Sequence, residues 1–130
     1  MINSRLIADL SLNCQAYFYR FRAKVEIRLG LIYGEDWGVC STKRDQEYQD
    51  YIYEQGRTRP GPIVTWTRES NHLNGDAFDV FILEDGKAVW VSPKYQLLAE
   101  VGKSVGLDCG FYWTKKKRDK GHYQLPLIVG

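Results

Sequence analysis

The segment from Ala77 to Leu83 is the part of the sequence that most narrows the possible folds. Apolar side chains occupy both of its alternating faces and Asp79 is its one polar residue, a pattern that indicates a strand buried in a sheet. The turn residues Glu-Asp-Gly-Lys follow at 84–87, and residues 88–91 favour a returning strand. The sequence therefore predicts a β-hairpin, and with it an antiparallel sheet.

Two helices are predicted before this hairpin, after a short helix or helical turn over residues 3–12. The first is a long amphipathic helix from Asn13, a candidate cap, to about Leu29, with Gly30 after its end. Its spacing places three residues on one side: Tyr17, Phe21 and Lys24. The second covers 45–55, with Asp45 as its cap and an inner side of Tyr48, Tyr51 and Ile52.

A third helix is predicted from Ser92-Pro93 to about Val105, because serine before proline is typical of a helix start. Further strands are expected at 37–42, 107–113 and 122–125. Helices mixed with antiparallel strands place the chain in the α+β class, as a small antiparallel sheet flanked by helices.

The composition is that of one soluble globular domain covering residues 1–130, with 44% hydrophobic and 26% charged residues. A formal charge of +2 is too small to indicate nucleic-acid binding by itself. The cysteines are odd in number and widely spaced, which predicts free thiols at Cys14, Cys40 and Cys109. We see neither a signal peptide nor an apolar run of membrane-spanning length.

The carboxylate of Asp79 needs a partner, because a charged group in an apolar strand is costly when unpaired. His72 precedes it in a loop whose Asn74-Gly75 turn lets the two side chains converge, and His122 would join from a neighbouring strand. Two imidazoles and one carboxylate suit Zn²⁺ and leave a fourth position open, which is the arrangement of catalytic zinc sites.

Two other charged residues are candidates for catalysis. Asp119, three residues before His122, could act as the general acid/base of a hydrolysis, and Arg44 could stabilise an oxyanion. Simpler interpretations stay open: the histidines could be ordinary core or surface residues, and Arg44 could pair with Glu47. The basic run Lys115–Lys120 is either a solvated loop or a contact for an anionic polymer.

These residues carry a resemblance to a known family. Ser70-x-His72-x-x-Gly75-x-Ala77-x-Asp79, followed by Asp119-x-x-His122, resembles the signature of the zinc D-Ala-D-Ala carboxypeptidase and L-alanyl-D-glutamate endopeptidase family. The similarity extends over about residues 3–126 and includes the segments around Arg44 and Gly106. It implies the fold that these peptidases share with the hedgehog signalling domain.

The resemblance also implies residue roles. It implies a metal held by His72, Asp79 and His122. It implies that Asp119 is the acid/base. Contacts to the substrate or transition state are implied for a further set: Arg44, Ser70 and Gln49. Lys43 departs from the family pattern, where an aromatic residue is usual, and Cys109 and Phe111 replace a usual Trp and Gly. None of these departures falls on an expected metal ligand, so they concern substrate fit and packing.

The resemblance is strongest to single-domain phage endolysins. It predicts a monomeric zinc peptidase that cuts the peptidoglycan stem peptide, with the bond between L-Ala and D-Glu as the expected target, and with no nucleic acid and no membrane insertion. We expect it to stay in the host bacterial cytoplasm before release to the cell wall. The alternatives are a D-Ala-D-Ala carboxypeptidase, an inactive zinc-containing wall-binding module, and a nucleic-acid binder using Lys115–Lys120.

Overall fold

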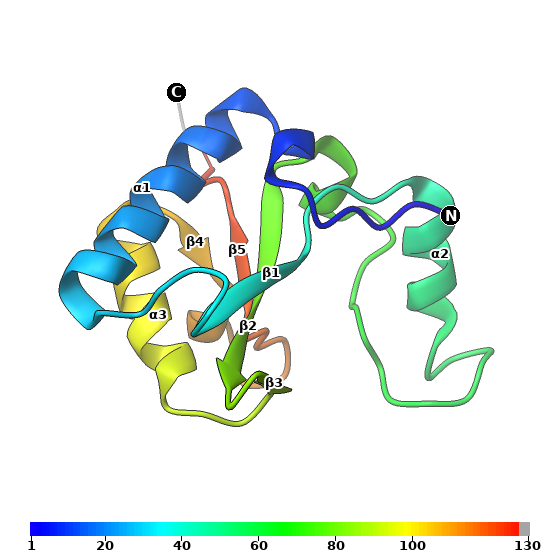
Figure 1. Ribbon diagram of the computed structural model, residues 1–130. Helices are drawn as coiled ribbons and strands as arrows, with labels where there is room; N and C mark the ends of the chain where they lie inside the picture. Colours follow the sequence, from blue (N-terminus) through cyan, green and yellow to red (C-terminus); the bar gives the residue numbers. More distant parts are fainter. Residues whose placement is uncertain (128–130) are drawn as a thin grey trace.

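The computed structural model describes residues 1–127 and confirms the α+β class (Figure 1). The helices are α1 (Leu12–Leu29), α2 (Gln46–Glu54) and α3 (Lys94–Ser104). The strands are β1 (Trp37–Ser41), β2 (Ala77–Glu84), β3 (Lys87–Val89), β4 (Asp108–Cys109) and β5 (His122–Gln124). Short 3₁₀ helices cover Ile7–Asp9, Asn71–Asn74 and Gly110–Tyr112.

The predicted strand β2 is the centre of the sheet. The strand order is β1-β2-β5-β4, with β3 paired to β2 through the hairpin, and every pair is antiparallel. Opposite Asp79 lie Ser41 of β1 and His122 of β5. The register of the sheet therefore places polar residues from three strands beside one another.

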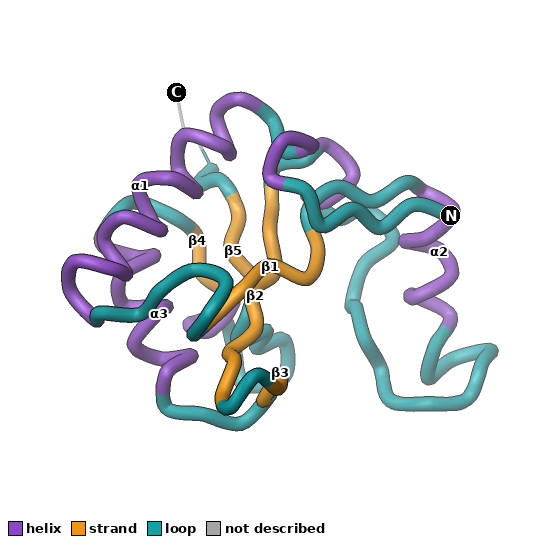
Figure 2. Tube along the Cα trace, viewed as in Figure 1, coloured by secondary structure: helices purple, strands orange, loops and turns teal. Residues whose placement is uncertain are grey.

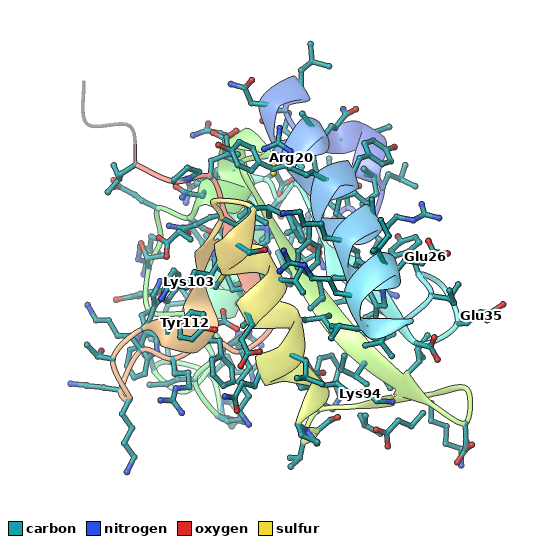
Figure 3. The ribbon with its side chains drawn as sticks, turned by 90° about the vertical axis from the view of Figure 1, so that its left-hand side faces the viewer. Arg20, Glu26, Glu35, Lys94, Lys103 and Tyr112 are labelled. Carbon is teal, nitrogen blue, oxygen red and sulfur yellow. The ribbon has the colours of Figure 1, made fainter. Side chains whose placement is uncertain are left out.

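Helices α1 and α3 lie side by side against the sheet, whereas α2 and the long loop after it stand apart on the other side (Figures 1 and 2). Charged residues such as Arg20, Glu26 and Lys103 lie on the outer surface of the α1–α3 layer (Figure 3). Beneath that layer, the ring of Phe78 from β2 stacks on Tyr123 from β5, with centroids 5.4 Å apart and planes 12° apart. Because side chains alternate along a strand, this core pair fixes Asp79 and His122 on the opposite face.

The long helix was predicted with nearly correct ends, and Gly30 closes it at φ 66°. The predicted cap was wrong. Ser11, not Asn13, is the cap, because its hydroxyl accepts a hydrogen bond from the Cys14 amide. The buried residues of the helix share only Phe21 with the side named from the spacing: they are Cys14, Phe18, Phe21 and Val25.

Other boundaries also differ from prediction. The short helix expected over 3–12 covers only Ile7–Asp9, because Ser4 pairs instead with the backbone of Thr42 and Lys43, and Leu12 already belongs to α1. The strand expected over 107–113 lasts two residues and then turns into the 3₁₀ helix at Gly110. The returning strand of the hairpin is Lys87–Val89 rather than 88–91.

Helix α2 has the predicted cap at Asp45, but Tyr51 on its expected inner side is 45% exposed. Its buried residues are Ile52 and the polar Gln49. Cys14, Cys40 and Cys109 are free thiols, as predicted. Among residues 1–127, no helix combines the length and apolar character that crossing a membrane requires.

Candidate metal centre

The structure brings together His72, Asp79 and His122, so that one ligand atom from each lies within 4.8 Å of the others. Asp79 Oδ1 is 3.2 Å from His72 Nε2 and 2.9 Å from His122 Nδ1. Both histidines are at least 94% buried, with 1% and 6% of their surface exposed. His72 lies on the 3₁₀ helix after Ser70, whose hydroxyl accepts a hydrogen bond from the His72 amide at 3.2 Å.

The outer nitrogen of each imidazole has its own acceptor. His72 Nδ1 is 2.6 Å from the backbone carbonyl of Thr42, and His122 Nε2 is 2.8 Å from the side-chain oxygen of Gln124. Oxygen atoms of this kind only accept, so each outer nitrogen carries the proton. The inner nitrogens of the neutral rings then present lone pairs to Asp79 Oδ1.

Three electron-pair donors that converge in this way need a cation between them. Imidazole held by an acceptor on its far nitrogen, together with a carboxylate, is a typical ligand set for zinc and similar divalent metals. The residues present therefore fit a metal ion, with His72 Nε2, His122 Nδ1 and the Asp79 carboxylate as the atoms that would hold it.

The electrostatics of the site agree with this need for a cation. Burial alone would raise the pKa of Asp79, but the facing His72 and His122 hold that pKa well below its ordinary value. Burial opposes the charged form of His122, yet Asp79 raises the pKa of His122 above its ordinary value. In the metal-free protein, the Asp79 carboxylate and the His122 imidazole thus favour opposite charges.

Arg44 lies three residues after the end of β1 and binds the same aspartate from the other side. Its NH2 group donates to Asp79 Oδ2 at 2.9 Å, its Nε to Ser41 Oγ at 3.0 Å, and its NH1 to Gln49 Oε1 at 3.2 Å. Gln49 is fully buried and donates in turn to the Thr67 carbonyl at 2.7 Å. The alternative pairing of Arg44 with Glu47 is not formed, since Glu47 binds the N-terminal amine.

Asp119 faces the same cleft from the loop before β5. Its amide donates to the Gly110 carbonyl at 3.0 Å, and its carbonyl accepts from the His122 amide at 3.2 Å. A Cβ atom at Gly110 would overlap that carbonyl, so glycine is required for the close approach. Asp119 is exposed to the cleft, and partial desolvation there together with the nearby charge of Asp79 raises its pKa, which suits a carboxyl group that must carry a proton.

These residues form the floor of a cleft of about 550 Å³. One wall is the loop Ile63–Thr67, and the other contains Trp113, Lys117 and Arg118. Each residue that the sequence singled out for the site lines this cleft except Gln49, which acts through Arg44.

Sequence reasoning missed three residues near the metal centre: Asp108, Trp113 and Gln124. The position of Gln124 gave a usable signal, since a residue two places after His122 in a strand projects from the same face. Asp108 and Trp113 gave none, because they reach the site through strand pairing and a 3₁₀ turn that the sequence pattern did not predict.

Comparison with known proteins adds independent evidence. The peptidoglycan L-alanyl-D-glutamate endopeptidase CwlK of Bacillus subtilis is 32% identical over 104 residues, which cover 71% of this chain and 62% of CwlK. The chain thus spans somewhat less than two thirds of that relative. No family model matches the sequence.

Two solved structures share the fold. The L-Ala D-Glu endopeptidase ChiX of Serratia marcescens gives a TM-score of 0.67 at 19% identity, covering 96% of this chain and 89% of ChiX. VanYB in complex with D-alanine-D-alanine gives 0.64 at 18% identity, covering 96% of this chain and 77% of VanYB.

The chain is thus similar in sequence to an L-alanyl-D-glutamate endopeptidase, and it shares the fold of ChiX and VanYB. The resemblance recognised from the sequence is therefore confirmed, and so is the fold that it implied. The departures at Lys43, Cys109 and Phe111 do not disturb that fold: Cys109 is a buried residue of β4, and Phe111 packs against the core.

Proposed function

We propose that this protein is a zinc-dependent peptidase that hydrolyses the stem peptide of bacterial peptidoglycan, at the L-Ala–D-Glu bond. The observation that carries the proposal is the convergence of one imidazole nitrogen from each histidine and the Asp79 carboxylate at the floor of an open cleft. The 32% identity to CwlK supports the choice of bond.

The metal would be held by His72, Asp79 and His122. Zinc, when bound, supplies a Lewis acid that polarises a carbonyl and lowers the pKa of water to about 7. Arg44 keeps the Asp79 carboxylate in place through Oδ2 and so leaves Oδ1 facing the two histidines. Its remaining N–H groups can donate into the cleft, where a tetrahedral intermediate would carry negative charge.

Asp119 is the residue proposed to move protons. It lines the cleft beside the metal ligands, and its raised pKa lets it accept a proton from water and return it to the leaving amine. The hydrogen bond that the His122 amide donates to the Asp119 carbonyl fixes the position of Asp119 relative to one metal ligand.

The cleft suits an acidic peptide. Lys117 and Arg118 provide positive charge on one wall, and Ile63, Val64 and Trp66 provide an apolar surface on the other. D-Glu adds a free carboxylate next to the scissile bond, which the cationic wall would attract. Ser70 lines the same cleft and is proposed, with Arg44, to contact the substrate.

The decisive experiment is a digest of purified, sequence-defined muropeptides with and without a chelator, followed by mass spectrometry. We expect a chelator-sensitive cut that exposes the amino group of D-Glu. Release of one terminal D-Ala would instead assign the protein as a carboxypeptidase. Zinc binding without any cleavage would indicate a wall-binding module.

Two variants separate metal binding from proton transfer. His72→Ala removes a ligand, so we expect loss of both zinc and activity. Asp119→Asn should keep the fold and the zinc but reduce turnover by about 10²- to 10⁴-fold, the usual contribution of an acid/base. Asp85→Asn, an exposed change in the hairpin turn, is the matched control. Near-full activity of Asp119→Asn would show that the assigned mechanism is wrong.

A lysin role is also proposed, on the sequence resemblance to phage endolysins. Protein produced in a bacterial cytoplasm should leave the cells intact until their membrane is permeabilised from outside, and then cause lysis. Cells producing the His72→Ala variant should not lyse under the same treatment.

A further inference from the structure

A chain of side-chain hydrogen bonds lies behind His122. Asp108 of β4 accepts from Trp113 Nε1 at 2.9 Å through Oδ1 and from Gln124 Nε2 at 3.0 Å through Oδ2. The amide oxygen of Gln124 is 2.8 Å from His122 Nε2. We call this series, from Asp108 through Gln124 to His122, the Asp108 chain.

The direction of every bond in the Asp108 chain follows from the carboxylate. A carboxylate accepts only, so the Gln124 side chain must direct its NH₂ group toward Asp108 and its oxygen toward His122. An amide oxygen also accepts only, so the proton of the neutral His122 ring must sit on Nε2. The lone pair is then left on Nδ1, the nitrogen that faces Asp79.

The two histidines therefore direct different ring nitrogens toward Asp79, Nε2 in His72 and Nδ1 in His122, and the reason differs between them. His72 is held by the backbone carbonyl of Thr42, which no substitution removes. His122 is held by the Gln124 side chain, which is held in turn by Asp108 of the neighbouring strand. Substitutions of these two residues can reverse the direction of the hydrogen bonds. The tautomer of His122 is thus a separate property of this site that can be tested.

The same carboxylate also holds part of the cleft wall. Trp113, the second donor to Asp108, lines the cleft, and its ring centroid lies 5.1 Å from that of His122. One residue, Asp108, therefore anchors both a candidate ligand and a side chain that substrate would meet.

We propose that Asp108 and Gln124 are positioning residues that select the His122 tautomer able to bind the metal. This inference rests on the proposed function, since it assumes a metal at His72, Asp79 and His122. Outer partners of metal-bound histidine commonly change metal affinity by about 10- to 100-fold when removed. We expect that range for loss of the Asp108 chain.

The test uses the donor-to-acceptor direction of the hydrogen bonds in the Asp108 chain. Asp108→Asn offers one acceptor and one donor where the protein has two acceptors, so Trp113 and Gln124 compete for a single oxygen. When Trp113 donates to that oxygen, the Gln124 amide rotates so that its oxygen faces the NH₂ group introduced by Asp108→Asn and its own NH₂ group faces His122 Nε2. The ring proton of His122 then moves to Nδ1. Adding Gln124→Glu restores the original direction of the hydrogen bond at His122. The glutamate carboxylate accepts both from the amide introduced by Asp108→Asn and from His122 Nε2.

Zinc affinity is measured on each purified protein by competition with a chromogenic chelator. Asp108→Asn and Gln124→Met should bind zinc about 10- to 100-fold more weakly, while Asp108→Asn/Gln124→Glu should recover most of the affinity. Asp85→Asn should bind as the unchanged protein does. Circular dichroism of the metal-free proteins verifies that each variant is folded.

Nitrogen-15 NMR of the imidazole rings gives a readout that does not depend on any variant, because the chain contains only two histidines. We expect the Nε2–H form for His122 and the Nδ1–H form for His72, both with zinc and in alkaline buffer without it. An Nδ1–H form of His122, unchanged zinc affinity in Asp108→Asn, or failure of the double variant to recover would overturn the inference. Absence of zinc binding by the unchanged protein would instead overturn the proposed function, and the NMR result would still decide the tautomer.

Discussion

Tyr123, the residue after His122, leads to our most detailed prediction. Its side chain is fully buried, and its hydroxyl has no hydrogen-bond partner among residues 1–127. Burial also raises its pKa well above the ordinary value, so the hydroxyl stays protonated. A buried polar group without a partner costs about 1–3 kcal/mol of folding free energy. Tyr123→Phe should therefore stabilise the protein.

The expected size of the gain follows from two opposing effects. Removing the hydroxyl recovers about 1–3 kcal/mol of desolvation cost. It also removes the packing contacts of one oxygen atom, which are worth a few tenths of a kcal/mol at about 0.1–0.2 kcal/mol per contact. The net gain is about 1–2 kcal/mol, or a rise in Tm of about 4–8 °C for a domain of this size. The stacked ring remains against Phe78, so zinc affinity should not change.

Tyr95 provides a matched control in the same core. Its hydroxyl donates to the Val89 carbonyl at 2.6 Å and accepts from the Ile82 amide at 3.2 Å. Tyr95→Phe leaves both backbone groups without this partner and should destabilise the protein by about 1–3 kcal/mol. Urea denaturation of the two variants gives the free energies of unfolding directly. If Tyr123→Phe lowers stability as Tyr95→Phe does, the hydroxyl of Tyr123 has a partner and the reasoning is refuted.

Two further predictions concern the metal centre. The folded-state pKa of Asp79 is lowered, so its contribution to stability is present above its unfolded value of about 3.8 and is lost as pH falls through the folded pKa. The folded-state pKa of His122 is raised, so its contribution is present below about 6.5 and is lost as pH rises through the folded pKa. The Tm of the chelator-treated protein should therefore be highest between these two values, and a maximum outside that window would contradict the assignment. Gly110→Ala should displace Asp119 and His122, because the added Cβ overlaps the Asp119 carbonyl and lies 3.1 Å from His122 Cβ. We expect it to weaken zinc binding and turnover together, whereas Gly86→Ala, in an exposed turn with open space around the new Cβ, should affect stability alone.

Much of the fold was predictable because periodicity reports which faces are buried. The strand at Ala77–Glu84, its hairpin, the Asp45 cap and the end of α1 at Gly30 all follow from local chemistry. The buried face of α1 did not follow, because basic and apolar residues alternate there and only packing against the sheet selects Phe18 over Tyr17.

The sequence by itself determined which residues could form a metal site, because a carboxylate inside an apolar strand requires a cation and the chain has only two histidines. Their convergence depends on the register that sets Asp79 opposite His122. Only the tertiary structure decided which nitrogen of each histidine faces inward and that Arg44 binds Asp79 rather than Glu47. These features depend on hydrogen bonds between residues distant in the chain, whose distances are set by strand pairing and leave no periodic pattern in the sequence.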